Sequence, residues 1–348
     1  DQPTSLNICE GEIVSAINFT TLNTVGTTTY DWDNDNANIG LALNGVDGIN
    51  SFTALNSTGT PQVATITVTP TFTNGLVPCT GNPKSFTITV NPSAQVNPIV
   101  STTVCAGDLI PKIEFKSTTV GTTTYAWTND NTSIGSILAS GTGPIPEFSA
   151  INTGTIPQIA TITVTPTYID NGFSCPGPEK TFTITVNPAA EVDQPNDEVF
   201  CASEFAVINF TTSNTVGTTT YDWENSNTAI GLTNLNGSGN SITLTTTNTG
   251  TTPITSTLIV TPTFSYNGVD CVGPNKVFTI TVNPNADMIP PASQTLCNGD
   301  PTTVDFATSN SVGTTTYAWT NNTPSIGIPA SGVGSIPVFS VVNTGNAP

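Results

Sequence analysis

The chain has 348 residues, only 8% of them charged, and its 24 carboxylates against five lysines and no arginine give a net charge of −19. Nucleic acids and anionic membrane surfaces require cationic partners, so neither is an expected partner. The absence of histidine and arginine removes the usual proton shuttle and phosphate fork, and no carboxylate pair recurs, so we expect no enzyme. No run of about 18 apolar residues is present, and membrane insertion is not expected.

Alternation of apolar and polar residues predicts short β-strands rather than helices. In chain order, the first such strands fall around 17–19, 30–32, 52, 64–72 and 86–90. The last of them is stopped by Asn91-Pro92, and Pro70 predicts an edge position or a bulge for the strand that contains it. A Gly/Pro/Cys-rich stretch between the last two strands predicts a hairpin loop.

This pattern is repeated along the chain. The segment T-V-G-T-T-T-Y-x-W occurs four times almost unchanged, and it spaces its tryptophans by a regular interval of about 96 residues. Such self-similarity indicates copied units arranged in tandem. About seven short strands per unit predict an all-β fold of immunoglobulin-like β-sandwich domains in an elongated array. The Asn-Pro stops predict repeat 1 at 1–92, repeat 2 at 93–188, repeat 3 at 189–284, and repeat 4 at 285–348, the last without its final two strands.

The cysteines follow the same period, which favours disulfides and an oxidising compartment. Three pairs share one spacing, namely Cys9 with Cys79, Cys105 with Cys175, and Cys201 with Cys271, and Cys297 is left over. A shorter spacing joins Cys79 to Cys105 of the next repeat, and counting cannot separate the two alternatives. Because the final strand runs from Cys79 toward the next repeat, Cys105 should lie most of a domain length away. We therefore predict the bridges within repeats, with Cys297 unpaired.

Two groups of residues are candidates for ligand binding. Asp31, Asp33 and Asp35 alternate as at the start of a calcium loop, but the other repeats do not keep these oxygens, so solvated carboxylates are the favoured interpretation and no cofactor is expected. The tryptophans could stack on sugars, but each shares a strand face with a tyrosine two residues earlier. That arrangement favours a core position for all four, namely Trp32, Trp127, Trp223 and Trp319.

The motifs of repeat 2, from V-C-A-G-D through T-V-G-T-T-T-Y-A-W and C-P-G-P to F-T-I-T-V-N-P, resemble a known repeat class. The chain is similar to the PKD-like, immunoglobulin-like repeats of very large surface adhesins in Bacteroidota, such as the gliding-motility adhesin of flavobacteria. The resemblance extends over all four repeats. It implies a seven-stranded sandwich, export by the type IX system, display as a filament on the outer membrane, and no catalytic residues.

These observations together predict a stalk segment of a secreted cell-surface adhesin, acting in gliding motility or surface attachment. Its expected partners are the neighbouring repeats of the same chain, and an external surface or polysaccharide bound through parts outside this sequence. The alternative is a ligand-binding module in every repeat, recognising a glycan or ice. It would require an exposed aromatic or carboxylate cluster in each repeat, and none is found.

Overall fold

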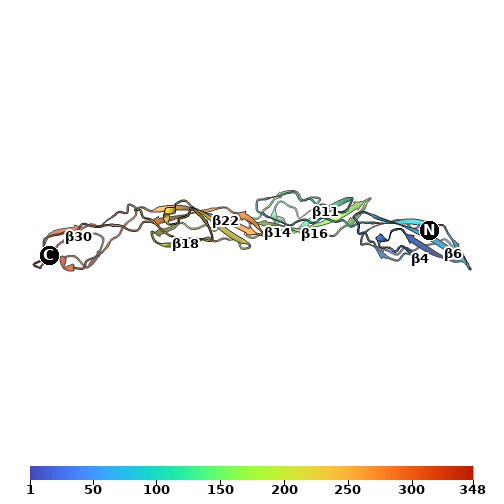
Figure 1. Ribbon diagram of the computed structural model, residues 1–348, viewed down its shortest axis with the longest axis horizontal. Coiled ribbons are helices and arrows are strands. Elements are labelled where there is room, and N and C mark those ends of the chain that lie inside the picture. Colours follow the sequence, from blue (N-terminus) through green and yellow to red (C-terminus); the bar gives the residue numbers. More distant parts are fainter. Residues whose placement is uncertain (348) are drawn as a thin grey trace. The chain divides into compact units, whose positions relative to one another are not determined.

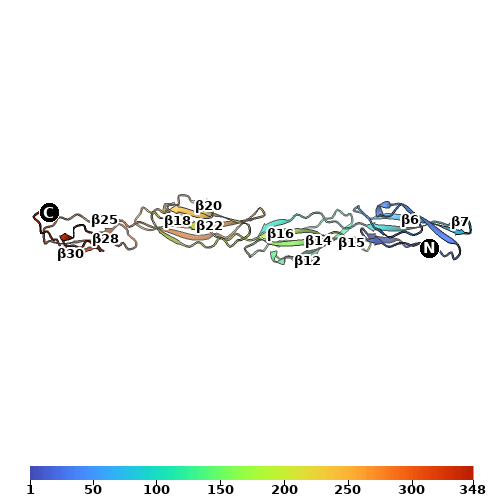
Figure 2. The same cartoon turned by 90° about the horizontal axis from the view of Figure 1, so that it is seen from below.

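The structure is a computed structural model that describes residues 1–347, and its regular secondary structure is almost entirely β-strand (Figures 1 and 2). The chain divides into two compact units, Asp1–Pro188 (unit 1) and Ala189–Pro348 (unit 2). Repeats 1 and 2 lie in unit 1, and repeats 3 and 4 lie in unit 2.

Repeat 1 has a main sheet in the order β1-β8-β6-β3-β4, to which β7 adds by pairing with β6, and a small second sheet of β2 and β5. Strand β1 runs parallel to β8, whereas the other ladders are antiparallel. The elements are β1 (Leu6–Cys9), β2 (Ile13–Val14), β3 (Thr27–Asn34), the 3₁₀ turn η1 (Ala37–Ile39), β4 (Asn44–Val46), β5 (Phe52–Thr53), β6 (Gln62–Asn74), β7 (Val77–Thr80) and β8 (Lys84–Asn91).

Repeat 2 reproduces this topology, with the main sheet β12-β11-β14-β16-β9, β15 on β14, and a second sheet of β10 and β13. Its elements are β9 (Thr102–Cys105), β10 (Leu109–Ile110), β11 (Thr122–Asn129), η2 (Thr132–Ile134), β12 (Ser140–Thr142), β13 (Phe148–Ser149), β14 (Gln158–Asp170), β15 (Phe173–Pro176) and β16 (Lys180–Asn187).

Repeat 3 has the sheets β17-β24-β22-β19-β20, with β23 on β22, and β18-β21. Its elements are β17 (Glu198–Cys201), β18 (Phe205–Asn209), β19 (Thr218–Asn225), η3 (Thr228–Ile230), β20 (Asn236–Ser238), β21 (Ser241–Thr245), β22 (Ile254–Tyr266), β23 (Val269–Val272) and β24 (Lys276–Asn283). Within residues 285–347, repeat 4 forms three strand pairs. Its elements are β25 (Met288–Ile289), β26 (Pro301–Val304), β27 (Ala307–Thr308), β28 (Ala318–Thr320), η4 (Pro324–Ile326), β29 (Ser331–Val333) and β30 (Ile336–Ser340).

The two strands that alternation predicts most clearly, 64–72 and 86–90, lie within β6 and β8. The strand expected around 17–19 is reduced to one bridge between Ile17 and Ile49. Its residues thus contribute to the second sheet without extending it.

The prediction of an edge position or bulge at Pro70 is wrong, because β6 is an inner strand of the sheet. Pro70 O accepts a hydrogen bond of 2.8 Å from Gly81 N, so the proline nitrogen faces the same side. On that side the pairing with β8 stops at Val68 and the pairing with β7 begins at Thr71. The proline therefore occupies the gap between two partner strands, where its missing N–H removes no ladder bond.

The repeated tryptophan, which lies on the third strand of repeats 1–3 and on β28 of repeat 4, packs against a glycine of the neighbouring strand. A Cβ at Gly141 would lie 2.4 Å from Trp127 Cζ2, so only glycine leaves room for the indole there, and the same contact recurs in the other three repeats. Trp32, Trp127 and Trp223 are 4–7% exposed in the cores of repeats 1, 2 and 3. Trp319 is half-buried, and repeat 4 has a hollow of about 820 Å³ beside Ile328, Ile336 and Phe339.

The helical segments among residues 1–347 are single 3₁₀ turns. The two turns of unit 1 are capped at their N-termini by Asn36 and Asn131, whose side chains accept from the N–H two residues on. Within the described residues, no helix has the length and apolar character needed to cross a bilayer.

Candidate functional site at the junction of repeats 1 and 2

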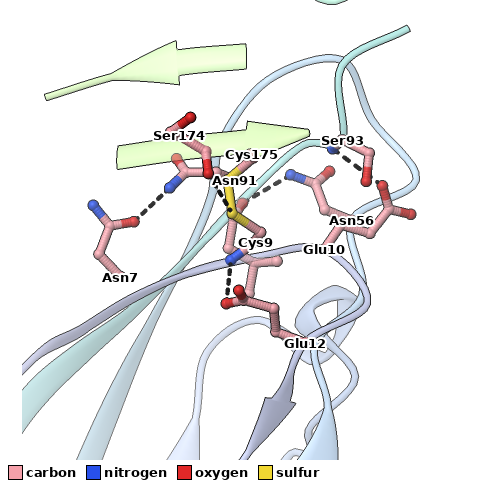
Figure 3. The surroundings of a disulfide bond; sticks show 10 residues. Asn7, Cys9, Glu10, Glu12, Asn56, Asn91, Ser93, Ser174 and Cys175 are labelled. Atoms are coloured by element: carbon pink, nitrogen blue, oxygen red, sulfur yellow. Dashed lines mark hydrogen bonds between the residues drawn. A yellow bond between two sulfur atoms is a disulfide. The ribbon is translucent and has the colours of Figure 1, made fainter. Parts of the chain in front are cut away.

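A disulfide between Cys9 of repeat 1 and Cys175 of repeat 2 is the main chemical feature of unit 1 (Figure 3). The two Cα atoms are 5.4 Å apart, and the sequence separation of the cysteines is 166. The predicted pairs Cys9–Cys79 and Cys105–Cys175 are therefore wrong. The shorter alternative, Cys79 to Cys105, is wrong as well, because Cys79 is a free thiol.

The direction of the first strand explains the correction. Because β1 runs parallel to β8, Cys9 lies beside Asn91 at the end of repeat 1 from which the chain leaves. Cys79 pairs with Phe72 toward the far end of β6, whereas Gln62 at the near end pairs with Val90. About ten residues of strand separate these two ends and span roughly 33 Å, whereas a disulfide needs Cα atoms about 4.4–6.8 Å apart. A bridge within the repeat is thus geometrically excluded.

The remaining cysteines depart from the predicted pairing in the same way. Cys201 is free and exposed, so the predicted Cys201–Cys271 bridge is wrong. Cys105 and Cys271 are each disulfide-bonded. Cys297, for which the spacing leaves no partner, is a free, exposed thiol.

Cys175 lies in a small apolar cluster formed at the junction. It is buried together with Ala94 of the linker and Tyr168 of β14, and Cys9 packs against this cluster from repeat 1. Burial is the main cause of a raised pKa of the Tyr168 hydroxyl, and the negative charge of Asp170 raises this pKa further. The bond is therefore sealed from solvent on its repeat 2 side, which limits the access of thiol reagents.

The backbone around Cys9 is held by hydrogen bonds to the Glu12 carboxylate and to the last strand of repeat 1. Cys9 N donates to Glu12 Oε2 at 3.0 Å, and Glu10 N donates to Asn91 O at 2.9 Å. Glu10 Oε2 in turn accepts from Ser93 N, at 3.2 Å, at the start of the linker (Figure 3). The first strand, the last strand and the linker of repeat 1 are thus tied together next to the bridge.

The linker itself is seated on repeat 2. A Cβ at Gly177 would lie 1.6 Å from Ala94 O, so the linker backbone runs directly over a glycine that no other residue could replace without displacement. Gln95 N donates to Thr119 Oγ1 at 3.0 Å, and Thr119 is itself buried. These contacts fix the linker on the surface of repeat 2, rather than leaving it as a free tether.

A third contact joins two loops. Val120 N of repeat 2 donates to Gly59 O of repeat 1 at 2.8 Å. The loop that carries Gly59 is shaped by Asn56, whose side-chain amide donates to Thr60 O and to Val90 O. The junction therefore combines a disulfide, a seated linker and a loop contact.

Local sequence patterns predict the strands but not the packing of the linker over Gly177. The relevant signals are two short motifs, C-x-G at the end of the seventh strand and N-P-x-A at the ends of repeats 1–3. The first occurs at Cys79-Thr80-Gly81, Cys175-Pro176-Gly177 and Cys271-Val272-Gly273. In unit 2, the backbone of Ala190 lies over Gly273 in the same way, because a Cβ at Gly273 would lie 1.7 Å from Ala190 O. The joint recurrence of both motifs is the pattern from which the contact could have been found.

The acidic and aromatic candidates lie apart from this junction. Asp31 and Asp33 are exposed on β3, and Asp35 Oδ1 accepts from Thr65 N at 2.7 Å, so this carboxylate already has a structural partner. In residues 1–347 no group of three or more Cys, Asp or Glu side chains is placed to hold a metal ion. The indoles of repeats 1–3 are enclosed in their cores and offer no ring face to a sugar.

No family model matches the chain, and no curated protein matches it. Similar solved structures include extracellular domains 3–5 of Drosophila OTK, with 11% identity over 82% of this chain and 95% of that chain and a TM-score of 0.31. Titin domains I67–I69 are 10% identical over 81% of this chain and 96% of that chain, with a TM-score of 0.40. Mouse protocadherin-24 EC1–3 is 14% identical over 81% and 98%, with a TM-score of 0.31.

Similarities at this level of identity and TM-score do not indicate what this chain does. The strand order and the repeated pairs of sheets described above make it an all-β protein of tandem immunoglobulin-like domains.

Proposed function

We propose that the chain is a stalk segment of a large secreted adhesin on the surface of a Gram-negative bacterium of the Bacteroidota, exported by the type IX system. In this role its repeats carry tension and set the distance between the cell surface and the adhesive parts of the protein. Those parts, elsewhere on the protein, bind the external surface or polysaccharide. Gliding motility and surface attachment are the processes in which such a stalk would act.

The observation that carries this proposal is the Cys9–Cys175 bond between two successive repeats. A recognition module needs a stable domain, which a bridge within that domain would serve. A bridge between domains adds nothing to a binding site, but it gives neighbouring domains a second covalent connection beside the linker. That is useful where the connection between domains is itself under load.

Surface composition supports the same role. A net charge of −19 with five lysines makes neighbouring filaments repel one another. Disulfides persist outside the reducing cytosol, in agreement with an extracellular location. The uniformity of the repeats is also expected of a spacer, in which every unit does the same work.

The alternative, a ligand-binding module in every repeat, lacks a supporting observation. The tryptophans of repeats 1–3 are core residues, and two aspartates of repeat 1 are replaced by Ala126 and Thr128 in repeat 2. A lectin-like array would instead present the same side chains on the surface of every domain.

The two roles differ in their response to repeat number. In cells that display the protein, removing repeats 1 and 2 should shorten the surface filament seen by electron microscopy and weaken attachment. Replacing them with two further copies of repeat 3 should restore both. If a glycan array is bound in proportion to the number of repeats, and filament length has no effect on attachment, the stalk role is refuted.

A further inference from the structure

We propose that the Cys9–Cys175 bond is a load bypass. Tension applied between Asp1 and Ala189 passes from β1 of repeat 1 through the sulfur atoms to β15 and β16 of repeat 2, and the stretch of chain between the two cysteines is shielded from it. This inference rests on the proposed function only in assuming that the chain is under tension. The bypass itself is a property of the covalent connectivity.

The path through the bond follows strands that are already extended. Leu6–Cys9 is a β-strand that runs parallel to β8, toward the end of repeat 1 where the linker begins. The bond then leads into Cys175, and Lys180–Asn187 continues as β16 toward the end of repeat 2. Strands rise about 3.3 Å per residue, close to the limit of an extended chain. Little slack therefore remains to be taken up before the bond carries load.

The alternative path runs through the folded domains. Without the bond, tension entering at β1 would leave through β8 and the linker, so the parallel β1–β8 ladder and then the rest of repeat 1 would have to resist it. Unfolding of repeats 1 and 2 would lengthen the chain many-fold. With the bond in place, a force applied between Asp1 and Ala189 does no work on the chain between Cys9 and Cys175, so the strands there unfold only by thermal opening.

The contacts around the bridge protect it while it is loaded. Cys175 is buried with Ala94 and Tyr168, which limits thiol exchange at this sulfur. Cys9 N donates a hydrogen bond to the Glu12 carboxylate and Glu10 N donates one to Asn91 O, so the loaded cysteine is held by these hydrogen bonds as well as by its sulfur. The exposed thiol of Cys79, at the equivalent position of repeat 1, gives a matched control within the same chain.

Single-molecule pulling of the full chain tests the bypass directly, with one handle at Asp1 and the other at the exposed Ala189. In the oxidised protein, only the residues before Cys9 and after Cys175 can separate the handles, to about 75 Å at full extension. The double variant Cys9→Ser/Cys175→Ser should release roughly 550–600 Å more, in unfolding steps of the repeats. Cys79→Ser should behave as the oxidised wild type.

A reductant keeps the experiment informative if the double variant does not fold. Dithiothreitol forms a mixed disulfide with one cysteine and then closes to its cyclic disulfide, leaving two protein thiols, so added reductant should produce the long extension in wild-type protein. An oxidised wild type that already shows this long extension would overturn the bypass. A stalk that fails the filament-length test but keeps the short extension would refute the proposed function and leave the bypass standing.

Discussion

The same hairpin has two different environments in repeats 1 and 2. Phe72 of β6 pairs with Cys79 of β7, and Tyr168 of β14 pairs with Cys175 of β15, in identical register. Cys79 is an exposed free thiol, whereas Cys175 is fully buried and bonded. The difference comes from Cys9 of repeat 1 and from Ala94 of the linker that follows β8, which together cover the hairpin of repeat 2.

One end of repeat 2 is thus completed by residues of the repeat and linker that precede it. In unit 2, the linker residue Ala190 is fully buried over Gly273, and Phe264 of the same hairpin is fully buried too. Stability in such an array is a sum of terms within repeats and terms at interfaces between neighbours. The covered hairpin of repeat 2 should therefore respond to substitutions that leave the open hairpin of repeat 1 unaffected.

The largest expected effect comes from removing the bridge. In the chain-entropy model, a disulfide that closes a loop of this length stabilises the folded state by roughly 5 kcal/mol, so Cys9→Ser/Cys175→Ser should lower the free energy of unfolding of unit 1 by up to about that amount. Hydrogen exchange measured at increasing urea concentrations gives the unfolding midpoint of each repeat separately. Cys79→Ser should leave the midpoint unchanged. An equal loss of unfolding free energy in the two variants would mean that the cysteines of the two hairpins contribute equally to stability.

A smaller effect on stability is expected from adding a methyl group at Gly177, where the linker packs on repeat 2. Gly177→Ala places a methyl group 1.6 Å from Ala94 O, so the linker must shift, at a cost of about 1–3 kcal/mol. Gly81→Ala in repeat 1 meets only Pro70, with its Cγ at 3.0 Å, and should cost clearly less. The measurement is the thermal midpoint of each variant. If Gly81→Ala proves as costly as Gly177→Ala, the glycine is required by the hairpin itself and not by the linker.

The smallest effect is on how the stability of repeat 2 depends on pH. Burial raises the pKa of the Tyr168 hydroxyl above its ordinary value of 10.0, with a further contribution from Asp170. The folded state then keeps this proton to higher pH than the unfolded chain does. Stability from this group is complete below about pH 10 and falls as the pH rises beyond it. Tyr168→Phe, which copies Phe72 of repeat 1, should reduce the alkaline loss of stability in repeat 2, and an unchanged pH profile would contradict it.

Much of the fold follows from the sequence because its signals are local. Alternation in 64–72 and 86–90 predicts β6 and β8, and the spacing of the tryptophans predicts tandem β domains. The strand Leu6–Cys9 escapes prediction, since so short a segment without strict alternation carries little signal. Its parallel pairing with β8 also depends on contacts with the opposite end of the repeat sequence.

The disulfide pairing is less predictable than the strands, because it depends on contacts between residues that are far apart in the sequence. Seven cysteines on one period allow several pairings, and spacing alone favours the bridge within each repeat. The decision depends on which end of the sandwich holds Cys9, and that depends on the short first strand. The place of Cys79 in the last hairpin follows from the sequence, but the corresponding place of Cys9 does not.

Peptide mapping without reduction tests directly whether Cys9 of repeat 1 is bonded to Cys175 of repeat 2. After free thiols are blocked, digestion with Lys-C and Glu-C separates all the cysteines, because Lys84 lies between Cys79 and Cys105 and each other neighbouring pair also has a Lys or Glu between its members. The expected result is a linked pair of peptides containing Cys9 and Cys175, with the blocking group on Cys79, Cys201 and Cys297. A peptide pair linking Cys9 to Cys79, or Cys105 to Cys175, would contradict a covalent junction between repeats.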